Sequence, residues 1–125
     1  MHLSLTRDRD GKSGFVHVQA SDLLYLEYDS MESRIHFHTL NEVFYAMGTL
    51  KYFQEALNNS GYEFEKVDRN YVVNTVKVVS VDRSNGYLYF EHPYTKHSKR
   101  CTVALSNLRP ILSNIMKLNP SLIVQ

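Results

Sequence analysis

FEKVDRNYVVNTVKVVSV, residues 64–81, is the stretch that decides the fold. Its second half is a β-branched apolar run, typical of a buried strand, which a single asparagine, Asn74, interrupts. Its first half is charged, with four ionisable side chains within five residues: Glu65, Lys66, Asp68 and Arg69. Because clustered charges stay in solvent, the pattern indicates a charged loop presented by a buried β scaffold.

The sequence around this stretch alternates between apolar and polar residues, as short strands do. Such runs occupy residues 15–19, 22–29, 34–40, 42–47, 75–82, 87–92 and 99–105. Asn85-Gly86 separates two of them and is a strong hairpin signal. Two segments have helical spacing instead: one begins after Thr49 and stops at 58–61, and the other covers 106–118, with Ser106 or Asn107 as its cap. We therefore expect a mostly β fold with two short helices.

Composition limits the class of protein. With 125 residues, 43% of them hydrophobic, the chain suits one globular domain. No apolar run approaches the length of a membrane helix and the N-terminus lacks the apolar segment of a signal peptide, so we expect a cytoplasmic protein with no membrane partner. The net charge is +1, but it is uneven: residues 1–74 carry 7 Lys/Arg against 11 Asp/Glu, and residues 75–125 carry 7 against 2.

No motif of catalysis or cofactor binding is present. A Gly-rich phosphate loop, a nucleophile elbow and HExxH are all missing, so we expect neither an enzyme nor a cofactor. Cys101 is alone and is interpreted as a buried packing thiol. His36 and His38 share one face of a predicted strand. They could hold a metal, completed by His17, His92 or His97, but a polar strand face is the preferred interpretation, and no metal is predicted.

The order of these elements resembles the LytTR family of bacterial DNA-binding domains, the usual output modules of response regulators. The resemblance covers residues 14–117 and is carried by DLLYLEYD, IHFHTL, EVFYAM, GTLKYFQEAL, YEFEKVDRNYVVN and VKVVSVD. It implies an elongated sandwich of small antiparallel β-sheets with two short helices at 14–118, a polar lead-in at 1–13 and a tail at 119–125. In such a domain Asn74 would be structural, bonding the backbone where the strand turns. Because the chain opens at Met1 with only a short polar lead-in, we expect a stand-alone protein without a receiver domain, and a domain excised from a longer protein is the alternative.

The resemblance also implies which residues contact DNA. In this family, loops at one edge enter successive major grooves, and the matching positions here are Ser33, Arg34, Arg69, Asn70, Ser106 and Asn107, with Lys99 and Arg100 on phosphates. Asp68 stands where the family has a histidine, and the family's late arginine is missing. Asp68 could orient Arg69 through a salt bridge, accept a hydrogen bond from cytosine, or weaken binding.

The function implied is that of a transcription regulator. It would bind double-stranded DNA sequence-specifically and read promoter direct-repeat half-sites, with a homodimer on DNA as an open possibility. The alternative is a LytTR-like protein-interaction module, or an antagonist of another regulator, with weakened DNA binding. Asp68, the missing arginine and the net charge of +1 support this alternative.

Overall fold

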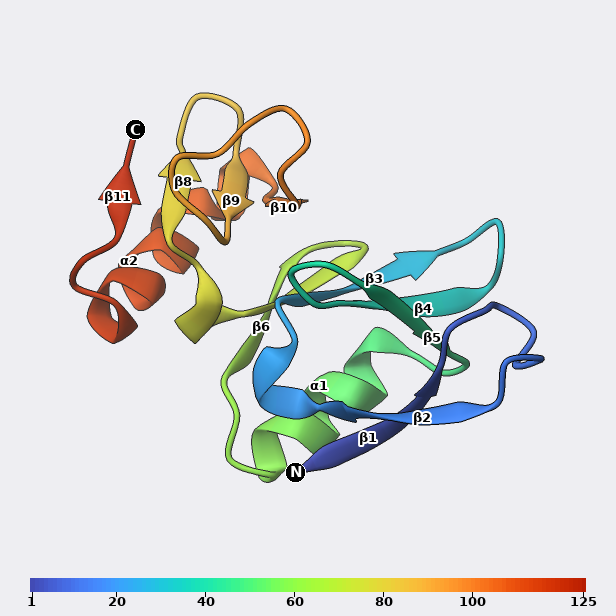
Figure 1. The fold of residues 1–125 in the computed structure, drawn as a ribbon. Coiled ribbons are helices and arrows are strands. Elements are labelled where there is room, and N and C mark those ends of the chain that lie inside the picture. Colours follow the sequence, from blue (N-terminus) through green and yellow to red (C-terminus); the bar gives the residue numbers. More distant parts are fainter.

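The computed structural model describes all of residues 1–125 and contains two β-sheets and two α-helices (Figure 1). The strands are β1 His2–Thr6, β2 Phe15–Gln19, β3 Tyr25–Asp29, β4 Arg34–His38, β5 Val43–Ala46, β6 Phe64–Asp68, β7 Tyr71–Asn74, β8 Ser80–Asp82, β9 Tyr87–Tyr89, β10 Arg100–Thr102 and β11 Ile123–Val124. The helices are α1 Leu50–Asn59 and α2 Leu108–Leu118, and short 3₁₀ helices lie at Ala20–Asp22, Thr75–Lys77 and Leu105–Asn107. The prediction of a mostly β fold with two helices is confirmed.

The larger sheet curves around α1 (Figure 1). Its seven strands run antiparallel in the order β2-β1-β5-β4-β3-β7-β6. A first hydrophobic core fills the space between sheet and helix, and Phe37 lies in it fully buried, with its ring edge-on to Phe53 at 4.9 Å. The Thr49 side chain accepts a hydrogen bond from the Tyr52 N–H at 3.0 Å and so caps α1, as the sequence predicts.

The second core explains the apolar half of the opening stretch. It lies between the other face of β3, β7 and β6 and the smaller sheet, whose strand order is β10-β9-β8-β11, together with α2. Successive residues of a strand point to opposite faces. Accordingly Val72 packs in the first core and its neighbour Val73 in the second, both fully buried. Strand β7 is thus the middle layer of the sandwich, which is why it tolerates no charge.

Asn74 has the structural role that the sequence analysis gave it. It ends β7, is buried, and its side-chain Nδ2 donates a hydrogen bond to the Leu23 carbonyl at 2.9 Å. Its backbone N–H donates to the Leu24 carbonyl at 2.9 Å. The side chain therefore holds β7 beside the segment that leads into β3. The packing role of Cys101 is likewise confirmed, because its thiol is fully buried in the second core and burial raises its pKa.

The structure differs from the expected boundaries at both ends of the chain. Residues 1–13 were expected as a lead-in, but β1 pairs with β2 and β5, and Leu5 is buried in the first core. The expected tail at 119–125 contains β11, which pairs in parallel with β8 and is the one exception to antiparallel pairing. Three further details differ. Residues 64–68, expected as a charged loop, form strand β6, because Phe64 and Val67 are buried while the backbone pairs with β7. Thr75–Lys77 is a 3₁₀ helix, and Asn107 makes no side-chain capping bond to α2.

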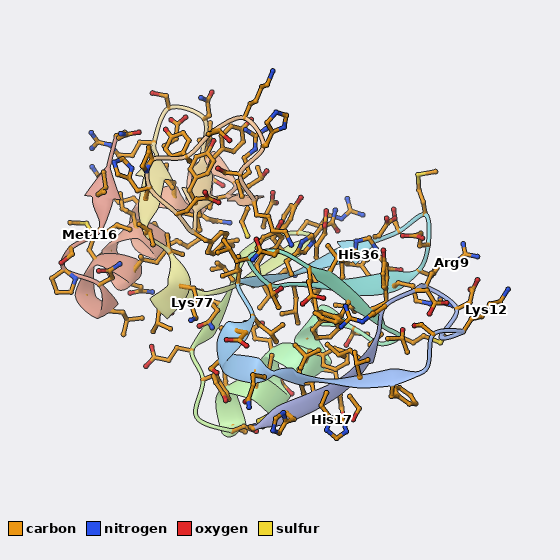
Figure 2. The ribbon with its side chains drawn as sticks, in the orientation of Figure 1. Arg9, Lys12, His17, His36, Lys77 and Met116 are labelled. Atoms are coloured by element: carbon orange, nitrogen blue, oxygen red, sulfur yellow. The ribbon has the colours of Figure 1, made fainter.

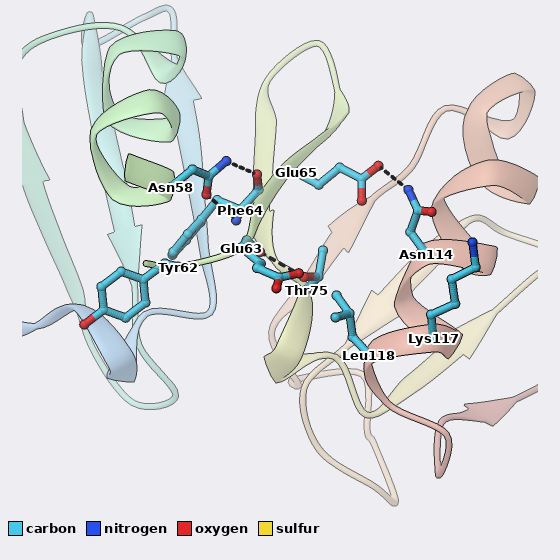
Figure 3. Close-up of a pocket in the computed structure, with 9 residues that line it drawn as sticks. All are labelled: Asn58, Tyr62, Glu63, Phe64, Glu65, Thr75, Asn114, Lys117 and Leu118. Carbon is cyan, nitrogen blue, oxygen red and sulfur yellow. Dashed lines mark hydrogen bonds between the residues drawn. The ribbon is translucent and has the colours of Figure 1, made fainter. Parts of the chain in front are cut away.

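A cleft of about 470 Å³ lies between the α1–β6 connection and α2 (Figure 3). Several of its polar side chains already form hydrogen bonds. Asn58 bonds both the N–H and the carbonyl of Phe64, at 2.7 and 2.9 Å, and Asn114 donates to Glu65 at 3.2 Å. The cleft therefore joins the two halves of the fold and offers few free groups to a ligand.

Neither α1 nor α2 has the length and apolar character needed to cross a bilayer.

The predicted hairpin between β8 and β9 depends on Gly86. Its φ is +71°, and a Cβ there would lie 2.7 Å from the Val103 carbonyl oxygen, a backbone atom. We expect Gly86→Ala to lower the free energy of unfolding by more than about 1 kcal/mol. Gly14→Ala is the matched control, because Gly14 has a φ of +79° with nothing within 4 Å. Urea denaturation of both variants measures the difference, and equal losses would contradict the clash.

Candidate nucleic-acid interface

Two of the expected DNA-contacting turns lie at the same edge of the larger sheet. Strand β3 pairs antiparallel with both β4 and β7, which brings the β3–β4 turn, residues 30–33, and the β6–β7 turn, residues 69–70, to the same end of β3 (Figure 1). The Tyr28 N–H donates a hydrogen bond to the Asn70 carbonyl at 3.0 Å and locks this arrangement.

The third expected segment is the 3₁₀ helix at Leu105–Asn107. The Ala104 N–H, just before it, donates to the Val67 carbonyl at 3.3 Å, which places the segment beside the end of β6. Ser106 and Asn107 are exposed, and their side chains have no hydrogen-bond partner. We call residues 30–33, 69–70 and 105–107 together the turn edge.

Arg69 is the free cation of the turn edge. Its guanidinium is exposed and forms no ion pair or hydrogen bond with the protein. The Asp68 carboxylate does not pair with it; instead, Asp68 Oδ1 accepts a hydrogen bond from the Arg69 backbone N–H at 2.6 Å. Of the three roles considered for Asp68, orientation of Arg69 by a salt bridge is absent, and Asp68 fixes the turn through the backbone. Asn70 is also exposed, with an unpaired side chain.

Ser33 and Arg34 have different surroundings. Ser33 is exposed in the β3–β4 turn with a φ of +54°. The Arg34 side chain is only 19% exposed, and its guanidinium donates to three backbone carbonyls, those of Arg9 at 2.9 Å, Ser33 at 3.1 Å and Glu32 at 3.2 Å. Arg34 thus ties the β1–β2 loop to the β3–β4 turn and is not free to meet DNA in this conformation.

Lys99 and Arg100 also differ in their surroundings. Lys99 is half-buried, and its Nζ donates to the carbonyls of Thr39 and Glu42, both at 2.6 Å. These carbonyls follow β4, at the opposite end of that strand from the turn edge. Burial lowers the pKa of Lys99. Arg100 is exposed, and its guanidinium lies 3.9 Å from the centre of the Tyr87 ring.

The position of Lys99 leads to a prediction. We expect Lys99→Met to lower the free energy of unfolding by about 1–3 kcal/mol, because two charge-assisted hydrogen bonds are lost while the apolar stem is kept. DNA affinity should change less than about twofold, since Lys99 lies away from the turn edge. Lys96→Met, in the same loop and exposed, is the control for both measurements. An unchanged stability together with weakened DNA binding would show that Lys99 is a phosphate contact instead.

A cluster of His36, His38 and Glu27 lies on the face of the larger sheet that points away from α1 (Figure 2 labels His36). His38 Nε2 lies 3.0 Å from Glu27 Oε1, and His36 Nδ1 lies 3.8 Å from the same oxygen. The hydrogen bond from His38 is the main cause that lowers the pKa of Glu27. Burial is the main cause that lowers the pKa of His38, and burial also raises the pKa of Tyr71 to about 12.

The alternation of the strand predicts that His36 and His38 share a face, but it gives no sign of Glu27. The candidate companions, His17, His92 and His97, do not join the cluster. Glu27 is the cross-strand partner of His36 in the β3–β4 pairing. Which residue of β3 lies opposite His36 depends on how the two strands are aligned. The β3–β4 turn sets this alignment, and the sequence does not define the length of that turn.

The lowered pKa of His38 predicts how stability depends on pH. Below about pH 6.5 the unfolded chain takes up a proton at His38 that the folded chain does not, so the free energy of unfolding falls as the pH drops. Glu27 acts in the same direction at lower pH, because its folded pKa is also lowered. Urea denaturation at about pH 7.5, 6.5 and 5.5 should show the fall, with a slope of at most about 1.4 kcal/mol per pH unit for one proton. We expect a shallower slope for His38→Gln and the wild-type slope for His97→Gln.

Comparison with known protein families identifies the family of this domain. The family described as LytTr DNA-binding domain matches residues 13–116, most of the chain. The chain belongs to the LytTR family. This confirms the resemblance that the sequence analysis identified, and it makes the protein a member of a non-catalytic family of DNA-binding domains.

A solved structure has the same fold as this LytTR domain. It is described as the LytTr DNA-binding domain of a methyl-accepting/DNA response regulator from Bacillus cereus. The two chains superpose with a TM-score of 0.64 at 17% sequence identity, and the alignment covers 94% of each. At this identity the likeness concerns the fold alone. No match was found among curated proteins.

Proposed function

We propose that this LytTR domain is a sequence-specific transcription regulator that binds double-stranded DNA through the turn edge. The observation that carries the proposal is the β6–β7 turn, where Arg69 and Asn70 are exposed and unpaired beside two other exposed segments. Turns held by a rigid sheet suit this role, because the scaffold fixes their spacing while their side chains stay free. Such a regulator would act in the cytoplasm, where bacterial DNA lies.

The side chains of the turn edge have the chemistry that base recognition needs. A guanidinium forms two hydrogen bonds with guanine O6 and N7, and an asparagine amide does the same with adenine N6 and N7. Arg69 and Asn70 are therefore assigned to base edges, with Ser33, Ser106 and Asn107 on bases or phosphates. Arg100 is assigned to a phosphate, because it is exposed and charged. Arg34 and Lys99 are left out, since backbone carbonyls already occupy them.

The arrangement on DNA is part of the proposal. We assign one half-site to one turn edge, so two copies on adjacent direct repeats would read a full promoter site. We assign no dimer contact to the free protein. Because few phosphates would be neutralised by one copy, affinity should depend moderately on salt and should rise when both repeats are present.

The experiment is selection from a random duplex pool. Duplexes retained by the protein are sequenced, and the enriched site and a shuffled duplex of the same composition are labelled for fluorescence anisotropy at about 50 to 200 mM salt. We expect an enriched motif, and affinity for it at least about a thousandfold above the shuffled duplex at the higher salt. No enrichment, together with equal binding of both duplexes, would refute sequence-specific regulation.

Two observations favour the second candidate, a protein-interaction module. Two of the expected cations, Arg34 and Lys99, are engaged inside the fold, and Asp68 adds a negative charge beside Arg69. Both facts reduce the attraction for phosphate. The same selection separates the candidates, because a domain that has lost DNA binding enriches nothing even at low salt, where phosphate attraction is strongest.

A further inference from the structure

We propose that Glu27, His36 and His38 form a binding site for a divalent transition metal ion of the Zn²⁺ type. Each residue offers one ligand atom, and the three atoms lie within 4.8 Å of one another. The residues come from neighbouring strands, β3 and β4, whose backbones are fixed by five cross-strand pairs. The donors are thus held by sheet structure and not by a loop.

The spacing of the donors suits a small metal ion. With bonds of about 2.0–2.1 Å and tetrahedral angles, ligand atoms around Zn²⁺ lie about 3.3 Å apart. Glu27 Oε1 lies 3.0 Å from His38 Nε2 and 3.8 Å from His36 Nδ1, on either side of that value. The two histidine nitrogens lie within 4.8 Å of each other, so side-chain rotations that bring them closer would complete the site.

The surroundings of the donors resemble the outer shell of known metal sites. A ligating histidine usually donates its other ring N–H to a carboxylate, and His36 Nε2 lies 3.0 Å from Glu32 Oε1. The second oxygen of Glu27 accepts a hydrogen bond from the Tyr71 hydroxyl at 3.1 Å. The ring of Tyr25 stacks on His38 with 4.2 Å between centroids, which fixes its orientation.

The proton between His38 and Glu27 is the one that a metal ion would replace, because His38 Nε2 and Glu27 Oε1 lie 3.0 Å apart. When Nε2 of His38 ligates, its ring proton moves to Nδ1, a buried nitrogen that has no hydrogen-bond partner, and this lowers the affinity for the ion. The positive charge of Lys99 opposes the ion and limits its affinity.

The donor set selects the class of ion. Two imidazole nitrogens and one carboxylate favour Zn²⁺, Co²⁺ or Ni²⁺ over Mg²⁺ and Ca²⁺, which prefer oxygen ligands. Three protein ligands leave one position open for water, and Glu27 is the most exposed of the three at 30%, so an ion enters from its side. Because Tyr71 directly follows the β6–β7 turn, a bound ion would stiffen the base of the turn edge.

The test is a titration of the full chain, without any polyhistidine tag and without DNA, with Co²⁺ as the spectroscopic probe. We expect the visible absorption of four-coordinate Co²⁺ to saturate at one ion per chain and to disappear when Zn²⁺ is added. His38→Gln and Glu27→Gln should each weaken binding more than about a hundredfold. Glu32→Gln should weaken it about tenfold, as loss of an outer-shell partner does.

Controls keep the test decisive. His97→Gln removes an exposed histidine outside the cluster and should bind Co²⁺ like the wild type. Circular dichroism confirms that each variant is folded; Glu27→Gln keeps an amide that can bond both His38 and Tyr71.

A second grouping, Asp29, Glu32 and His36, is more exposed, and Asp29 Oδ1 already accepts two backbone N–H groups. Absence of Co²⁺ absorption in the wild type would overturn the proposal. So would binding abolished by Asp29→Asn and unaffected by His38→Gln.

Discussion

Phe37→Ala is expected to lower the free energy of unfolding by about 3–5 kcal/mol, the largest stability effect in the molecule. Phe37 is the largest side chain that is fully buried, and it fills the centre of the first core beneath α1. Truncation removes apolar contact area and leaves a cavity that the curved sheet and the helix cannot close without moving. Its loss also removes the edge-on partner of Phe53. Urea denaturation measures the change.

Phe15→Ala is the matched control for this prediction. Phe15 undergoes the same chemical change in the same sheet, but its side chain is 77% exposed at the start of β2. We expect a change within about 0.5 kcal/mol. Similar losses for the two variants would mean that the larger sheet is not packed around α1 as described.

Arg69→Ala is expected to weaken binding of the selected duplex by about five- to a hundredfold, corresponding to about 1–3 kcal/mol for one bidentate base contact. The effect should be smaller for the shuffled duplex, because a base contact contributes only at the cognate base. Protein stability should change by less than about 0.5 kcal/mol, since the exposed Arg69 side chain forms no ion pair or hydrogen bond in the fold. Fluorescence anisotropy with both duplexes gives the two affinities.

Lys117→Ala controls for the loss of one positive charge. Lys117 is exposed near the end of α2. The turn after α2 is held beside Val78, because the Asn119 side chain donates a hydrogen bond to the Val78 carbonyl. Val78 follows the end of β7, whereas Arg69 precedes its start. We expect its effect on both duplexes to stay within about twofold. If Arg69→Ala and Lys117→Ala weaken both duplexes equally, Arg69 contributes only general charge and the base contact is wrong.

Much of the fold could be predicted because its signals are local. Alternation identified β2 to β5, and the helical spacing after Thr49, in which Leu50, Phe53 and Leu57 fall on one face, identified α1. The terminal strands were missed for different reasons. Strand β1 has only five residues, and the long polar loop after it gives the N-terminus a polar character. Strand β11 has only two residues, too few to show a period. Its pairing with β8 depends on how α2 returns the chain, which is tertiary information.

The candidate interface was predictable only in part, because the exposure of a side chain depends on contacts with backbone groups that are distant in the sequence. The β3–β4 turn follows from the strand pattern, but the charged residues expected as a loop belong mostly to strand β6, and only residues 69–70 form the turn. Arg69 remains a prediction that its exposed side chain supports. Arg34 and Lys99 look like free cations in the sequence. Their carbonyl partners lie 25 residues away at Arg9 and 60 residues away at Thr39, so only the folded chain shows that both are engaged.

The central claim is that the turn edge is the DNA-binding surface, and amide chemical shifts test it most directly. A ¹⁵N-labelled sample of the whole chain is titrated with the selected duplex and, separately, with the shuffled one. We predict that the largest shifts on adding the selected duplex fall at Ser33, Arg69, Asn70, Ser106 and Asn107, while Lys117 and the α1 C-terminus stay unchanged. Shifts concentrated around α1 or the cleft beside α2, with the turn edge unaffected, would contradict the account.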